Sequence, residues 1–402
     1  MSLNRDMKTE MLLAWYDRNG RTLPWRSDPT PYHVWLSEIM LQQTRVEAVK
    51  EYYRRFTEAL PDVRALAQAP EEQYMKLWEG LGYYSRVRNL HKAAVQIMED
   101  HGGQMPPTKK ELLALSGIGD YTSSAIASIA FGERTPAIDG NLLRVYARMM
   151  KEEENIKTGT AKKKAETWFL EFMPEDRPGD FNQAVMDLGA TVCLPNGAPE
   201  CGRCPWKEFC RAHADGTELR YPVIPPKKER RKEERTILLL IDETGRIALR
   251  KRPEKGLLAG LWEYPAAEGA LNPEEAAKTA ERILSGANPA AAVVEELPRA
   301  KHIFSHIEWH MTGYALRVKR PCAAGAGDPG EDRPESMKML YPGNDSVSGK
   351  TEAVRGGAPE GEKEKAADFL WVTPQELSAT YAVPTALVKY TEWIRDHFDR
   401  TE

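Results

Sequence analysis

The segment LSGIGDYT at residues 115–122 sets the fold class expected for the first half of the chain. It lies between a short helix and an apolar helix expected over Ser123 to Phe131. Gly117 and Gly119 permit a tight turn that, with the amide of Ser116, would present backbone N–H groups at a helix start, where a phosphate can bind. A plain connection between two helices has the same pattern, so both interpretations stay open here.

The chain from its start to about residue 215 is predicted to be all helical, because its apolar residues recur at helical spacing between Pro and Gly punctuation. Two helix starts carry the pattern of a capping box. These are Thr44 with Glu47 and Thr108 with Glu111, pairs in which each side chain would satisfy an amide of the first turn.

Residues 216–235, which hold several prolines and a charged run, are predicted to form an extended linker to a second domain over 236–402. Residues 321–365 are rich in Gly, Pro and charged residues, so we expect a disordered insertion there. The elements expected in this domain form an α+β pattern: a hairpin of strands at Thr236–Ile241 and Ile247–Leu249, a helix over Pro273–Leu284, a strand through Ile303–Val318, a strand at Phe369–Val372 and a helix after Pro384.

Chain length and net charge restrict the class of protein only loosely. A chain of 402 residues suggests two or three domains, and a net charge of −4 neither requires nor excludes a nucleic-acid partner. The amino terminus lacks an apolar signal core, and no apolar stretch approaches the length that spans a bilayer. We therefore expect a soluble, cytoplasmic protein that does not bind a membrane.

Four of the five cysteines are clustered as Cys193-x7-Cys201-x2-Cys204-x5-Cys210, and Cys322 stands alone. This distribution is not that of a secreted disulfide framework. Four thiolates from one short loop suit either a tetrahedral zinc ion or an iron–sulfur cluster, and spacing alone does not choose between them.

Two carboxylates stand out. Asp139 comes directly before an amphipathic helix expected to begin near Leu142, so it is either an N-cap or a functional group. Glu38 is followed by Ile39, Met40 and Leu41, and such surroundings would desolvate it and raise its pKa toward the range useful for proton donation. The alternative for Glu38 is an exposed helical glutamate.

A helical region that ends in a four-cysteine loop resembles the helix-hairpin-helix DNA glycosylases of the endonuclease III and MutY type. The segment WLSEIMLQQT at residues 35–44 is similar to a signature of the MutY family. The resemblance implies a [4Fe-4S] cluster on the four cysteines, Glu38 as general acid, and Asp139 as the group that stabilises the positive sugar at the transition state. The first cysteine spacing is one residue longer than usual in these families, and Gly197 with two flanking prolines is expected to absorb the difference.

The resemblance also refines the reaction. Relatives that cut the strand carry a lysine just before the Thr122 position, and this chain has Tyr121 there, which implies a monofunctional enzyme supported by Tyr121 and Asn141. The residues that match family positions around the extruded base are Trp25, Arg26, Leu41, Gln183 and Met186. Those expected to contact the DNA are Gln43, Thr44, Leu81 and Tyr83 at the gap in the duplex, and Ser116, Gly117 and Gly119 in the hairpin.

The second half resembles the Nudix-like domain of the MutY family in the segments LLAGLWEYP (257–265) and KHIFSH (301–306). The resemblance implies that Phe304, Ser305 and His306 read 8-oxoguanine, although His306 and His310 also fit as ordinary strand residues. The segment after Pro265 lacks the glutamate-rich helix that holds magnesium in a Nudix hydrolase, so nucleotide hydrolysis is not expected.

Together these features predict a monomeric enzyme of base excision repair that removes adenine opposite 8-oxoguanine or guanine in double-stranded DNA and associates with the nucleoid. Two alternatives stay open. A thymine or uracil mismatch glycosylase would share the helical half and the cysteines without needing Glu38 or a second domain. A non-catalytic DNA-binding module would share the hairpin without needing both carboxylates.

Overall fold

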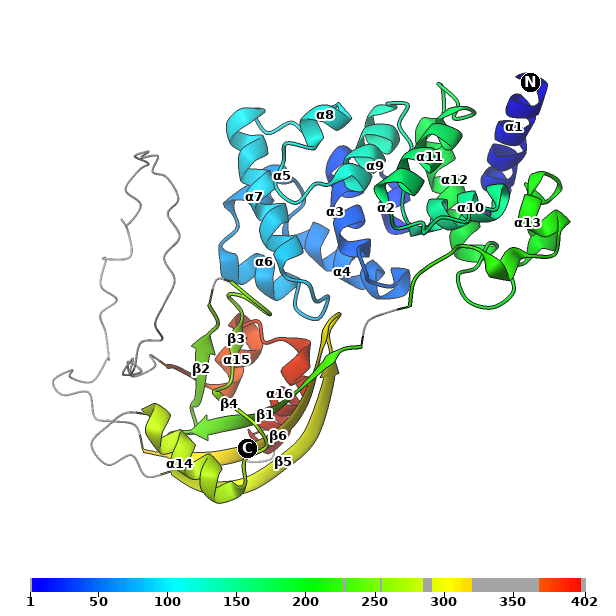
Figure 1. The fold of residues 1–402 in the computed structure, drawn as a ribbon. Helices are drawn as coiled ribbons and strands as arrows, with labels where there is room; N and C mark the ends of the chain where they lie inside the picture. The colour runs from blue at the N-terminus through cyan, green and yellow to red at the C-terminus, as the bar shows by residue number, and fades with distance from the viewer. Residues whose placement is uncertain (1, 227–228, 254, 285–290, 320–368, 399–402) are drawn as a thin grey trace, which may run out of the picture. The chain divides into compact units, whose positions relative to one another are not determined.

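The computed structural model describes residues 2–226, 229–253, 255–284, 291–319 and 369–398. Two compact units are present (Figure 1). The first comprises Met1–Arg230, Arg252–Leu261 and Ser378–Thr385, and the second comprises Arg231–Lys251, Trp262–Leu377 and Ala386–Glu402. The insertion expected at 321–365 lies outside the described residues. Within the described ranges, no helix combines the length and apolar character needed to cross a bilayer.

The first unit is all helical in its described part, as predicted. Its long elements are α1 (Ser2–Asn19), α3 (Pro31–Leu41), α4 (Val46–Ala59), α7 (Ser85–Asp100), α9 (Asp120–Phe131), α10 (Gly140–Met150), α11 (Gly159–Leu170) and α12 (Pro178–Thr191). Shorter helices are α2 (Pro24–Ser27), α5 (Val63–Gln68), α6 (Glu71–Leu77), α8 (Lys109–Leu112) and α13 (Arg211–Ala214), and the 3-10 turns are η1 (Cys201–Arg203), η2 (Lys207–Phe209) and η3 (Glu218–Arg220).

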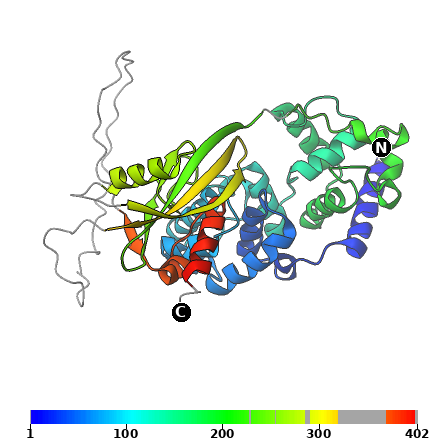
Figure 2. The ribbon, with the colours of Figure 1, turned by 90° about the horizontal axis from the view of Figure 1, so that it is seen from below.

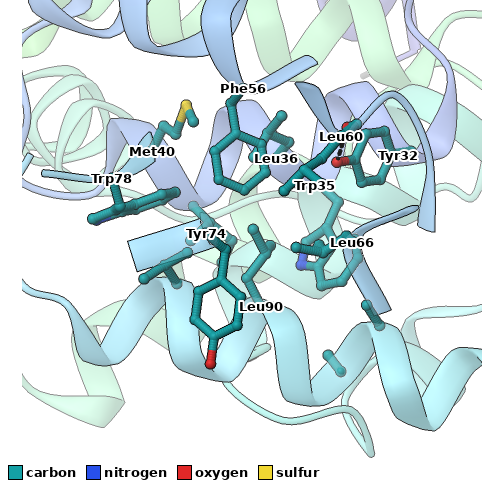
Figure 3. Packing of buried hydrophobic residues seen from close by; sticks show 14 of the residues in the cluster. Tyr32, Trp35, Leu36, Met40, Phe56, Leu60, Leu66, Tyr74, Trp78 and Leu90 are labelled. Carbon is teal, nitrogen blue, oxygen red and sulfur yellow. Dashed lines mark hydrogen bonds between the residues drawn. The ribbon is translucent and has the colours of Figure 1, made fainter. Parts of the chain in front are cut away.

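Two apolar cores build this unit. The first surrounds α3, α4 and α7, where Trp35, Met40, Phe56 and Trp78 are fully buried (Figure 3). The second surrounds α10, α11 and α12 with the buried aromatic residues Phe169, Phe181 and Trp206. Ile129 of α9 packs against both cores, so α9 joins them.

The helix starts follow the sequence in one case and not in another. Thr108 caps α8 as predicted, and its hydroxyl accepts a hydrogen bond from the amide of Glu111 at 3.3 Å. The other half of the box differs, because the Glu111 carboxylate accepts from the Thr108 hydroxyl at 2.6 Å and not from an amide. The box expected at Thr44 is wrong: α4 begins after Arg45 with no side-chain cap, and the Thr44 hydroxyl donates back to Gln42 O at 3.4 Å. Here the chain makes a turn with Gln43 at a φ of +57°, which takes Thr44 out of the capping position.

The apolar helix after the hairpin begins earlier than expected. α9 begins at Asp120, and Gly119 is its N-cap in extended conformation. A carboxylate in the first turn is favourable at the positive end of a helix, which accounts for the early start. Tyr121 consequently lies in the first turn of α9.

The second unit is α+β. Its strands are β1 (Arg231–Ile241), β2 (Ile247–Lys251), β3 (Trp262–Glu263), β4 (Ala266–Glu268), β5 (Ala291–Ile303), β6 (Ile307–Val318) and β7 (Leu370–Val372). They form one mixed sheet in the order β3-β2-β1-β6-β5, with β4 paired to β1 and β7 paired to β2. Its helical elements are α14 (Pro273–Leu284), the start of α15 (Pro374–Thr380), the end of η5 (Thr385–Leu387) and α16 (Val388–Phe398), while Ser378–Thr385 belongs to the first unit.

Two expectations for this unit need correction. β1 already begins at Arg231, so the last residues assigned to the linker pair in parallel with β6. The single strand expected through Ile303–Val318 is part of a hairpin, in which the longer β5 runs antiparallel to β6. The sequence conceals β5 because it is largely exposed and its pairing shifts between Leu297 and Ala300, around a proline.

Helices cover both faces of this sheet (Figures 1 and 2). Ala276, Ala280 and Leu284 of α14 pack with the alternate residues Leu238 and Leu240 of β1 on one face. On the other face, Tyr390 of α16 lies against Gly313 of β6, where an added Cβ would be 2.6 Å from the Tyr390 ring. The α+β class predicted for this half is therefore correct.

Candidate active site

A cavity of about 380 Å³ opens in the first unit between elements of both cores. Its walls come from α2, α3, the turn after α3, α9, α10 and α12. The structure brings together here all of the residues predicted as catalytic or as base pocket, and two of those predicted at the DNA gap. They are Trp25, Arg26, Glu38, Leu41, Gln43, Thr44, Tyr121, Asp139, Asn141, Gln183 and Met186.

Glu38 lies on the inner face of α3 and is only 7% exposed, which excludes the alternative of a surface glutamate. The phenol of Tyr121 donates a hydrogen bond to Glu38 Oε2. Burial raises the pKa of Glu38 to about 7, and the charge of Asp139 acts in the same direction, whereas the Tyr121 hydrogen bond and Arg26 lower it. Glu38 is thus partly protonated at neutral pH.

Asp139 is the N-cap of α10, so the structural interpretation of this residue is correct. Its Oδ1 accepts a hydrogen bond from Leu142 N at 2.7 Å, and its Oδ2 accepts one from Asn141 Nδ2 at 2.7 Å. Burial raises the pKa of Asp139, and these two hydrogen bonds act against that increase. Capping also fixes the carboxylate in the cavity that holds Glu38, so the two interpretations of Asp139 are compatible.

The orientation of Asn141 is set by Arg144, one turn further along α10. Arg144 Nη2 donates to Asn141 Oδ1 at 2.8 Å and to Gly189 O at 2.6 Å, while Nε donates to Cys193 O at 2.7 Å. With its oxygen held by Arg144, the Asn141 amide turns its nitrogen toward Asp139. Arg144 was not predicted from the sequence, although a charged residue within the apolar pattern of α10 is a signal that could have indicated it.

Arg26 is fixed by an aspartate that the sequence analysis also missed. Asp187 of α12 is fully buried, and Arg26 reaches its two oxygens at 2.8 and 3.0 Å. Arg21 donates to the same carboxylate through its Nε at 2.8 Å and its backbone N at 2.9 Å. These hydrogen bonds and charges hold the pKa of Asp187 low against its burial, so an ion pair shapes this wall of the cavity.

The hairpin at 115–122 has the expected tight turn. Gly117 has a φ of +74°, and an added Cβ there would be 2.5 Å from Asn89. The amide of Ser116, however, donates to Gln96 Oε1 at 2.8 Å, so it does not face outward as a free donor. Gly119, in contrast, has open space around it.

Two turns carry the residues expected at the gap in the duplex, and we call residues 42–44 and 80–83 the gap turns. Gln43 and Tyr83 are exposed, and both have left-handed backbone conformations, with φ of +57° and +48°. Leu81 is 6% exposed and belongs to the first core, so in this conformation it does not reach the surface as expected.

The four clustered cysteines form no disulfide and line one small cavity, closed partly by Trp206. Burial raises the pKa of Cys204 to about 12 and that of Cys201 to about 11. Burial of these two residues thus favours neutral thiols over thiolates. Four sulfur donors in one cavity suit zinc or iron, either of which would favour the thiolate form. Gly197 has a φ of +75°, which gives the loop the sharp turn expected at the longer spacing.

Other polar groups adjoin this cysteine loop. Arg148 Nη1 lies 3.1 Å from Cys193 Sγ. Cys201, His213 and Glu218 offer donor atoms within 4.8 Å of one another, an additional set that the sequence analysis did not find. His213 Nδ1 and Glu218 Oε1 are 2.7 Å apart.

In the second unit, Phe304, Ser305 and His306 form the turn between β5 and β6. The Phe304 ring packs edge-on against Trp309, with ring centroids 4.8 Å apart, while Ser305 and His306 are exposed. His306 is therefore a turn residue, unlike His310, which lies in β6.

The two acidic residues in the first turn of α14 serve the helix itself. Glu275 and Asn272 form a reciprocal capping box, with amide-to-side-chain distances of 2.9 and 3.0 Å. Glu274 pairs with Lys278 at 2.7 Å.

Comparison with known proteins identifies both halves. Residues 36–171 match the HhH-GPD superfamily of base excision DNA repair proteins, and residues 236–393 match the NUDIX domain. An adenine DNA glycosylase of Mus musculus is 35% identical over 370 residues, which cover 78% of this chain and 71% of the mouse protein.

This chain belongs to the adenine DNA glycosylase family. A family member of Homo sapiens is 35% identical and covers 77% of this chain and 67% of its own, and one of Buchnera aphidicola (subsp. Schizaphis graminum) is 32% identical and covers 75% and 85%. Among solved structures, a thermostable thymine-DNA glycosylase aligns with 54% of this chain and 100% of its own, at 27% identity and a TM-score of 0.48. The two family matches and the adenine DNA glycosylase relatives confirm the predicted family and the two-part fold class.

Proposed function

We propose that this protein is a monofunctional DNA glycosylase that removes adenine paired with 8-oxoguanine or guanine. The observation that carries the proposal is one cavity holding two carboxyl groups in different surroundings. Glu38 is buried with a pKa of about 7. Burial raises the pKa of Asp139 as well, but Asp139 accepts two hydrogen bonds that favour its charged form. Such a pair can donate a proton from one group and keep negative charge on the other.

The chemistry follows from these positions. An adenine extruded into the cavity receives the Glu38 proton on a ring nitrogen, and the electron pair of the glycosidic bond then leaves with the base. The positive charge that develops on the sugar is stabilised, or trapped covalently, by Asp139. Water then adds to the sugar, any bond between the sugar and Asp139 breaks with its electron pair returning to the carboxylate, and the proton of the water passes to the Glu38 carboxylate. Tyr121 and Asn141 keep the two carboxyl groups in place.

Absence of strand cleavage is the second part of the proposal. Cutting the strand through a Schiff base requires an uncharged amine at the sugar. Among the described residues that line the cavity there is no lysine, and Tyr121 occupies the position just before Thr122. Water is therefore the final nucleophile.

Cys193, Cys201, Cys204 and Cys210 would hold a [4Fe-4S] cluster. The donor set supports it, because all four cysteines line one cavity and thiolate sulfur is the usual ligand of such a cluster. When bound, the cluster would supply iron–sulfur bonds that tie the loop together.

Phe304, Ser305 and His306 would read the base opposite the target adenine. Their place in the turn of a hairpin supports this role, since Ser305 and His306 offer exposed polar side chains beside an aromatic ring. We further propose that the protein acts as a monomer on chromosomal DNA in the cytoplasm.

Single-turnover cleavage, developed with alkali, tests the function on duplexes with adenine opposite 8-oxoguanine, guanine or thymine, and with thymine opposite guanine. Excision of adenine opposite the first two bases is expected. Adenine left intact in every duplex, or full activity of Glu38→Gln, would contradict the proposal. Removal of thymine opposite guanine would favour a thymine mismatch glycosylase, and strand cutting without alkali would contradict monofunctional chemistry.

A further inference from the structure

Arg86 lies in the first turn of α7, is only 8% exposed, and does not line the catalytic cavity. Its Nη1 is 2.8 Å from Ile39 O, 2.9 Å from Met40 O and 2.6 Å from Gln42 O. The last carbonyls of a helix have no partner within the helix, so these contacts satisfy the end of α3, the helix that carries Glu38. They also hold the first gap turn.

The other terminal nitrogen of Arg86 holds the second gap turn. Nη2 is 3.0 Å from Leu81 O, 3.1 Å from Gly82 O and 3.3 Å from Thr44 Oγ1. The guanidinium carbon also lies 5.7 Å from the centroid of the Tyr83 ring. One planar group therefore joins both gap turns to the end of α3. Burial lowers the pKa of Arg86 to about 10, which leaves it charged at neutral pH.

Both gap turns are strained in the same way. Gln43 and Tyr83 are exposed non-glycine residues with left-handed backbones. Such conformations are unfavourable for residues with a side chain and persist where the surrounding structure fixes them. Arg86 supplies that fixation, because it binds the carbonyl directly before each of these two residues, Gln42 O and Gly82 O.

We propose that Arg86 is a positioning residue that sets the two gap turns at the spacing required to extrude the target base from the duplex. This inference rests on the proposed function, because it assigns the gap turns to base extrusion. Lysine at this position would keep the charge but lose the planar fork, so it could not hold both turns at once.

The test compares two duplexes that share one adenine opposite 8-oxoguanine. In the first, the flanking bases are paired; in the second, flanking mismatches open the stack beforehand and remove much of the extrusion cost. We expect Arg86→Lys to lose roughly tenfold or more in single-turnover rate on the paired duplex, and to come within about threefold of wild type on the opened one. Arg54→Lys, on an exposed face of α4, is the matched control and should leave both rates unchanged.

Thr44→Ala provides a second variant that leaves Arg86 intact and removes one acceptor, and it should show a smaller loss with the same selectivity for the paired duplex. An Arg86→Lys rate equal to wild type on the paired duplex, or an equal loss on both duplexes, would overturn the role of Arg86 while leaving the proposed function intact. A wild type inactive on both duplexes would overturn the proposed function and this role with it.

Discussion

Tyr121 donates its phenolic hydrogen to the carboxylate of Glu38, and this bond joins the first turn of α9 to the inner face of α3. The bond favours the charged form of Glu38, whereas burial favours the neutral form. Burial prevails, because the pKa of Glu38 is about 7. A general acid must be protonated to act, so the rate of base removal should fall as the pH rises through this value.

Removal of the Tyr121 phenol should shift the pH at which the rate of base removal declines. In Tyr121→Phe the charged form of Glu38 loses a hydrogen bond, so the pKa rises and the decline in single-turnover rate shifts to higher pH. The maximal rate should fall about tenfold, because Glu38 is less firmly oriented. Rates measured from pH 5.5 to 9 with wild type as control check this expectation, and a shift to lower pH would contradict it.

Glu38 should also lower the stability of the protein at alkaline pH. Because its pKa is raised on folding from 4.5 to about 7, the folded state binds the proton more tightly than the unfolded state. The resulting loss in the free energy of unfolding is absent below pH 4.5 and grows between pH 4.5 and pH 7. It is complete above pH 7, where it amounts to on the order of 3 kcal/mol.

Glu38→Gln cannot ionise, so its free energy of unfolding should exceed that of wild type at pH 8 and approach it at pH 5. Urea unfolding at both pH values measures the difference. A gain that is the same at both pH values would show that ionisation is not its cause.

The sequence alone predicted those features of the site that depend on neighbouring residues in the chain. Apolar neighbours of Glu38 indicated its burial, and the position of Asp139 before a helix indicated a cap. Both residues then meet in one cavity because their helices pack through α9.

The sequence was insufficient where partners are distant in the chain. The pairs Arg26–Asp187 and Arg86–Gln42 join residues from different helices or turns, and no periodicity marks them. β5 was missed because most of its residues are exposed, so it lacks the alternation that marks a half-buried strand.

Asp139 allows catalysis to be separated from capping. Asparagine caps helices about as well as aspartate, so Asp139→Asn should change the free energy of unfolding by less than about 1 kcal/mol while reducing the excision rate by roughly 1000-fold. Thr158 is a suitable control, because it caps a helix, α11, but lies outside the cavity. Thr158→Ala should cost about 1 kcal/mol of stability and leave excision unchanged. Comparable loss of activity in both variants would mean that capping alone explains Asp139.

The Arg26–Asp187 pair should be costly to break. Asp187 is fully buried between two arginines, so Asp187→Asn leaves their charges without compensation and should reduce the free energy of unfolding by roughly 3 kcal/mol. Asp17→Asn is the control, because Asp17 pairs with Arg177 at the surface, where such a pair contributes less than about 1 kcal/mol. Equal effects of the two substitutions in urea unfolding would disprove the special role of the buried pair.

The cysteine loop makes a prediction about composition. A [4Fe-4S] cluster requires about four irons and four sulfides per chain, whereas a zinc site would contain neither. Metal analysis of the purified protein distinguishes the two.

Three variants locate the metal. Cys204→Ala should lose most of the iron and, because the loop packs with Trp206 against the second core, also lower the melting temperature. Cys322→Ala removes a cysteine outside the cluster and should retain the iron. His213→Ala should retain it as well, and a complete loss of metal in that variant would place the metal on Cys201, His213 and Glu218 instead of on the four cysteines.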